Sequence, residues 1–82
     1  MTISSLVLTL SDDMAAQRAA IDHLSKDPRV ILGSQAATRL PLVLETRSAR
    51  EGADAAEALL EVTGVTFVDV VAVLFDGPEL EK

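Results

Sequence analysis

A mostly apolar run, VTGVTFVDVVAVLFDG (Val62 to Gly77), constrains the fold more than any other segment of the chain. A helix that crosses a membrane needs about 20 consecutive apolar residues, and this run is shorter and contains the carboxylate of Asp69. Valine predominates, with threonine and phenylalanine, and these side chains lose rotamer freedom in a helix but pack well on a pleated sheet. The run therefore predicts a β-strand over Val65 to Phe75, with no stable membrane insertion.

The length of the chain, 82 residues, suits a single domain. The sequence contains no cysteine and one histidine. A disulfide framework, a cysteine-based zinc site and a histidine-rich metal centre are therefore excluded, and the fold must hold by apolar packing alone. We assign residues 1–76 to the domain and residues 77–82, which are polar and acidic, to a flexible tail.

The first third of the chain predicts a strand followed by a helix. Residues Ile3 to Leu10 alternate, with leucine at every second position, which is the pattern of a half-buried strand. The segment Asp12 to Lys26 is rich in helix formers. Ser11 is its predicted N-cap, and Pro28 prevents the helix from continuing.

The middle of the chain predicts a hairpin and a second helix. Val30 to Gln35 and Leu40 to Thr46 are two apolar runs joined by a short polar link, although Pro41 must then lie among the first residues of its strand or at a bulge. The sequence SARE, Ser48 to Glu51, matches a capping box that begins a helix. Gly64 supplies the left-handed residue that ends many helices.

The predicted order of elements is strand, helix, strand, strand, helix, strand. This order is typical of the α+β ferredoxin-like βαββαβ fold, a two-layer sandwich in which two helices cover one face of a four-stranded antiparallel sheet. The other face of such a sheet meets solvent and is normally polar.

Here the face without helices is predicted to be partly apolar. If the alternating leucines point at the helices, valines, hydroxyls and two carboxylates point the other way. A continuous exposed patch of this kind usually marks an interaction surface. The alternatives are that these residues are only tolerated on a sheet, or that the face pairs with a second copy. The candidate binding residues are Ser5, Val7, Thr9, Val43, Glu45, Asp69, Val71 and Val73.

The net charge of −6 opposes binding to nucleic acid, which requires clustered lysine and arginine. The chain also has no tyrosine or tryptophan on which bases could stack. A basic peptide, in contrast, is electrostatically favoured. Because the chain starts without a basic segment and a small-residue cleavage site, we expect a cytoplasmic protein.

No arrangement of residues predicts catalysis. His23 lies in the first predicted helix with no nucleophile indicated nearby, and Asp12 and Asp13 are explained by the helix dipole. The single glycines fall far short of a phosphate-binding loop. We therefore expect a protein that is not an enzyme and uses no metal or cofactor.

Three short motifs give the chain a resemblance to a known family. They are ISSLVL at Ile3 to Leu8, LVLE at Leu42 to Glu45, and the pair Gly64 and Val65 that opens a valine-rich last strand. In these, and over nearly its full length, the chain resembles the NapD family, the cytoplasmic assembly chaperones of periplasmic nitrate reductase. The resemblance implies a ferredoxin-like protein that binds the twin-arginine signal peptide of the catalytic subunit and delays export until the cofactors are inserted.

On this interpretation Glu45 and Asp69 lie nearest the arginines of the peptide, and the protein is a monomer or a weak homodimer. Two alternatives remain open from the sequence. One is a ferredoxin-like regulatory module that binds a small ligand as a dimer. The other places the peptide along the edge of the strand Val30 to Gln35 by β-augmentation.

Overall fold

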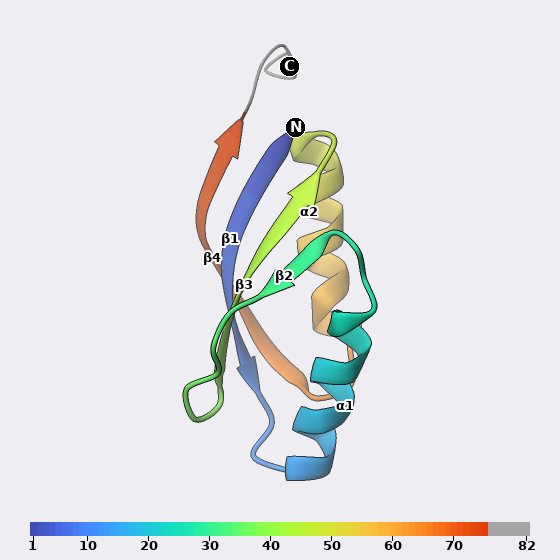
Figure 1. Ribbon diagram of the computed structural model, residues 1–82, viewed down its shortest axis with the longest axis vertical. Helices are drawn as coiled ribbons and strands as arrows, with labels where there is room; N and C mark the ends of the chain where they lie inside the picture. The colour runs from blue at the N-terminus through green and yellow to red at the C-terminus, as the bar shows by residue number, and fades with distance from the viewer. Residues whose placement is uncertain (76–82) are drawn as a thin grey trace.

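Four antiparallel strands form one sheet with both helices on the same side in the computed structural model, which describes residues 1–75 (Figure 1). The strand order β2-β3-β1-β4 confirms the predicted ferredoxin-like α+β fold. Asp76, the predicted tail 77–82 and the side chain of Phe75 lie outside the described part. The elements are β1 (Thr2–Leu10), α1 (Met14–Ser25), β2 (Val30–Leu32), β3 (Arg39–Thr46), α2 (Ala49–Ala58), a 3-10 turn (Leu59–Glu61) and β4 (Val65–Phe75).

The core lies between the sheet and the helices, and leucines make up most of it. Along β1 every even-numbered residue is buried and every odd-numbered residue is half-buried, as the alternation predicts. Ala20 and Leu24 from α1 and Leu59 from the 3-10 turn complete the core from the helix layer. The sheet contributes Leu6, Leu8, Leu10, Leu40, Leu42, Leu44 and Val65.

The helix α1 begins two residues later than predicted. Asp13 is the N-cap, and its carboxylate accepts a hydrogen bond from the backbone N–H of Ala15. Ser11, the predicted cap, instead accepts one from the N–H of Asp13 at 3.1 Å.

The predicted left-handed residue is confirmed at Gly64, where φ is 96°. A Cβ atom at Gly64 would also collide with the backbone oxygen of Ala16.

The helix α2 begins with the predicted cap, changed in one detail. The hydroxyl of Ser48 accepts a hydrogen bond from the N–H of Glu51 at 3.1 Å. The Glu51 carboxylate reaches back to the N–H of Arg47 at 3.0 Å, one residue earlier than a capping box predicts. This bond ties the end of β3 to the first turn of α2.

The strand β2 is shorter than predicted, because its ladder with β3 ends at Leu32. Beyond this point the N–H of Gly33 still donates to the carbonyl of Pro41 at 2.8 Å. The nitrogen and the carbonyl of a residue point to the same side of a strand, so the missing N–H of Pro41 faces the side where the β2 ladder has ended. Pro41 is therefore tolerated near the start of β3, as predicted.

The last strand, β4, has the predicted bounds and pairs with β1. Its register shifts at two points, which are β-bulges or irregularities opposite Ser5/Leu6 and Thr9/Leu10. In the part of the chain that the structure describes, neither helix has the length and apolar character needed to cross a membrane.

Candidate functional site

The side of the sheet opposite the helices is uncovered in Figure 1, and we call it the open face. Cross-strand partners point to the same side of a sheet, so the register identifies the residues that share this face. They are Ile3, Ser5, Val7 and Thr9 of β1, Ile31 of β2, Arg39, Pro41, Val43 and Glu45 of β3, and Phe67, Asp69, Ala72 and Leu74 of β4.

Most of the residues predicted from the sequence do lie on the open face, and the register brings them together. Ser5 is opposite Val43 on β3, and Val7 is opposite Asp69 on β4. The predicted residues on the open face are Ser5, Val7, Thr9, Val43, Glu45 and Asp69. Their position is confirmed, and their role in binding stays a prediction.

The predicted placement of Val73 on the open face is wrong, and that of Val71 is not supported. Val73 is the partner of Ser4, which is buried on the helix side. Val71 has no partner in the register, because it is the extra residue between Val70 and Ala72. Strict alternation along the strand predicts both on the open face. One inserted residue reverses the alternation for every position that follows it.

Six apolar residues of the open face were not in the predicted set: Ile3, Ile31, Pro41, Phe67, Ala72 and Leu74. Phe67 and Leu74 are the most exposed large side chains of β4 on this face, at 59% and 64%. Simple alternation along β1 and β3 would have identified Ile3 and Pro41. Leu74 follows the bulge, so no sequence pattern indicated its direction.

The two carboxylates of the open face lie far apart. Glu45 is opposite Ile3 on one side of β1, whereas Asp69 is opposite Val7 on the other. They are separated by about 13 Å along the strands and about 10 Å across them, or about 16 Å in total. Arg39 lies at the other end of β3, about 20 Å from Glu45. The charge on the open face therefore changes sign along β3.

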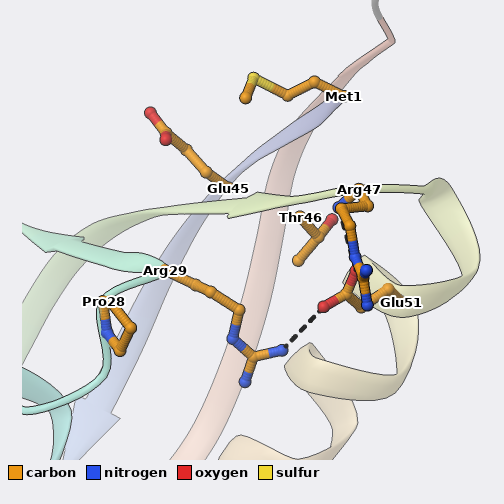
Figure 2. Close-up of a pocket in the computed structure, with 7 residues that line it drawn as sticks. All are labelled: Met1, Pro28, Arg29, Glu45, Thr46, Arg47 and Glu51. Atoms are coloured by element: carbon orange, nitrogen blue, oxygen red, sulfur yellow. Dashed lines mark hydrogen bonds and ion pairs between the residues drawn. The ribbon is translucent and has the colours of Figure 1, made fainter.

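A hollow of about 420 Å³ lies beside Glu45, where the chain before β2 meets the end of β3. Figure 2 shows that the side chains of Glu45 and Met1 lie on one side of the β3 ribbon, whereas Arg29 and Glu51 lie on the other. The hollow thus borders the open face and the start of α2. It is lined by Met1, Pro28, Arg29, Glu45, Thr46, Arg47 and Glu51.

Among residues 1–75, the side-chain charges around the hollow are paired except for that of Glu45. Arg29 contacts Asp27 at 3.1 Å and Glu51 at 3.3 Å, and Arg47 contacts Glu51 at 3.5 Å. The hydrogen bond from Arg29 lowers the pKa of Asp27, and the N–H of Arg47 is the main cause that lowers the pKa of Glu51. Two arginines and two carboxylates balance. The Glu45 carboxylate makes no hydrogen bond or ion pair with any residue from 1 to 75.

This arrangement is suited to binding a segment that is apolar with a cationic group beside it. The apolar residues of β1 and β3 can cover an apolar segment. The Glu45 carboxylate, on the same side of β3 as the Met1 side chain, can accept hydrogen bonds from a cationic side chain. Within residues 1–75, no three His, Asp or Glu side chains are grouped as metal ligands.

A scan against protein-family models and a search of curated proteins both find no match for this chain.

Proposed function

We propose that the open face binds the twin-arginine signal peptide of a periplasmic molybdoenzyme, the catalytic subunit of nitrate reductase, and so prevents export before cofactor insertion. One observation carries the proposal: an apolar sheet face borders Glu45, a carboxylate without an ionic partner among the described residues. A twin-arginine signal peptide has the matching order, a basic start followed by a moderately apolar stretch. In this role the protein acts in the cytoplasm and carries no cofactor itself.

The dimensions of the open face fit one peptide helix. Four strands span about 14 Å between the outer strand axes, and a helix with its side chains is about 10 Å wide. A helix lying along the strands would therefore place its apolar side over Val7 and Val43. Burial of an amphipathic helix on an apolar groove or face is an established mode of peptide recognition.

The charges of the open face favour one direction for that helix. Its N-terminus, with the arginines and the positive end of the helix dipole, would lie at Glu45. Its C-terminus would lie at Arg39, about 20 Å away, which corresponds to roughly 13 helical residues. Asp69 is about 16 Å from Glu45 and would add longer-range attraction instead of contacting the same arginine.

Calorimetric titration with a synthetic twin-arginine peptide tests the proposal. Val7→Asp should weaken binding more than about 100-fold, because a carboxylate would be buried under the apolar side of the peptide. Val70→Asp is the matched control, since Val70 is exposed on the opposite side of the sheet, and it should change the affinity by less than about twofold. Circular dichroism checks that both variants fold.

The ionic part of the proposal has its own test. Glu45→Gln should weaken binding about fivefold at low salt, which is the size of an exposed ion pair. A peptide with both arginines replaced by glutamine should show no difference between the wild type and the Glu45→Gln variant. Unchanged affinity in Val7→Asp, or an equal loss in Val70→Asp, would show that the open face is not the binding surface.

A further inference from the structure

The strand β4 leaves a long free edge on the sheet. Among residues 1–75 it pairs with β1 only, and it extends over Val65–Phe75, whereas the other edge strand, β2, covers Val30–Leu32. Proteins normally protect long edges with charges, prolines or bulges. On β4 both register shifts and Asp69 lie before Ala72. The segment Val70 to Leu74 that follows Asp69 contains only apolar residues.

This segment is exposed on both sides of the sheet. Leu74 is 64% exposed on the open face, and Val70 and Val73 are 49% and 40% exposed on the helix side. The helices therefore leave the outer part of β4 uncovered. A free edge that is apolar on both sides of the sheet is complemented well by another strand that is also apolar on both sides.

From this edge we infer that a second copy of the chain pairs with β4 in antiparallel fashion, about a two-fold axis at Val73. In this register Val73 faces its own copy, and Ala72 faces Leu74 of the other chain. Ala72 and Leu74 both belong to the open face, so the two sides of the sheets match. The result is one continuous sheet with both helix layers on the same side.

Electrostatic repulsion selects this register over one nearer the centre of the strand. A two-fold axis at Val70 would place the two Asp69 carboxylates at diagonally adjacent positions, where like charges destabilise strand pairing. An axis at Val73 separates them by about 25 Å. The apolar residues beyond the bulge then pair, and the charged half of each strand stays outside the interface.

The pairing joins the two open faces, so that Ala72 and Leu74 of each copy extend the apolar surface of the other. It does not depend on the proposed peptide binding. A stable interface buries about 800 Å² on each partner, and pairing of one short strand segment buries less, so the dimer is expected to be weak. Each chain has a net charge of −6. Added salt should therefore strengthen the dimer, whereas it should weaken binding of a basic peptide.

Sedimentation equilibrium of the full chain from about 10 µM to about 1 mM tests this inference. At high salt the average mass should rise with concentration from 8.7 kDa toward twice that value. Val73→Lys places two ammonium groups opposite each other at the axis and should raise the dissociation constant at least tenfold. Leu74→Lys, at a position that is 64% exposed, should do the same and serves if Val73→Lys fails to fold.

Ile31→Lys is the matched control, because Ile31 is 54% exposed on the other edge strand. It should dimerise like the wild type. A wild-type mass that stays at 8.7 kDa throughout the concentration range would overturn the inference. So would a dimer that is lost in Ile31→Lys or Val7→Asp but kept in Leu74→Lys, since it would form through β2 or the open face. Peptide affinity should be measured at protein concentrations below those at which the dimer forms. Failure of the dimer inference and failure of the proposed peptide binding are then observed separately.

Discussion

The two faces of the sheet are built from the same strands but differ in what their residues do. Along β1, Leu6 and Leu8 are 1% and 0% exposed beneath the helices, whereas Ser5 and Val7 between them are only half-buried on the open face. The helix side is uniformly aliphatic at its centre. The open face mixes valines with hydroxyls and charges. Stability and the proposed binding therefore depend on alternate residues of the same strands, and mutation should separate the two.

The largest effect should come from the buried side of β1. Leu8→Ala should lower the free energy of unfolding by about 3 kcal/mol, because it leaves a cavity in the core. Val7→Ala, one position away, should cost less than about 1 kcal/mol, because Val7 is half-buried. Urea denaturation measures both. Equal losses would mean that the two faces are equally packed and that the comparison is wrong.

Gly64→Ala should have the next largest effect. The residue has a positive φ and packs against the backbone of Ala16 in α1. The substitution should lower the free energy of unfolding by about 2 kcal/mol through backbone strain and displacement of α1. Peptide affinity of the folded protein should not change, since α1 lies behind the sheet. A parallel loss of affinity would show that the two faces are coupled.

Ser48→Ala should have a smaller effect on the helix side. It removes the hydroxyl that accepts the N–H of Glu51 at the start of α2. The expected loss is about 1 kcal/mol in the free energy of unfolding. Ser34→Ala is the control, because Ser34 is exposed in the segment between β2 and β3. A thermal melt in which the two variants behave alike would contradict the capping role of Ser48.

The pH dependence of stability should be the weakest of these effects. The pKa of Asp27 and that of Glu51 are both lowered in the folded protein, by hydrogen bonds from Arg29 and from the N–H of Arg47. The two ionised carboxylates therefore stabilise the folded protein fully above the unfolded pKa of about 4. This stabilisation is lost as the pH falls through the lower pKa values of the folded protein. Glu51→Gln should reduce the loss of stability between about pH 5 and about pH 2. Denaturation midpoints across this range provide the measurement, and an unchanged slope would contradict the assignment.

The fold was predictable because its signals are local and mutually consistent. The alternation of leucines in β1 and β3, the cap at Ser48 and the left-handed Gly64 each follow from neighbouring residues. The cap of α1 was misplaced by two residues, between the neighbouring candidates Ser11 and Asp13. The error in β2 arose where a distant contact decides the outcome. The β2 ladder ends early next to Pro41, which comes from the facing strand.

The candidate site was less predictable than the fold. The face of Val7, Val43 and Glu45 followed from alternation, but one extra residue in β4 moved Val73 to the other side. A bulge of this kind leaves no signature in an apolar run of valines. The hollow beside Glu45 could not be predicted from the sequence either, because its lining combines the first residue of the chain with residues around 28 and 47.

Backbone amide chemical shifts measured during titration with a twin-arginine peptide would show directly whether the open face binds it. The largest shifts should map to the central strands on the open face, at Ser5, Val7 and Val43, and to Glu45. Amides on the exposed side of α1 should stay unchanged. Shifts confined to the helices or to β2, or no shifts at saturating peptide, would contradict binding at the open face.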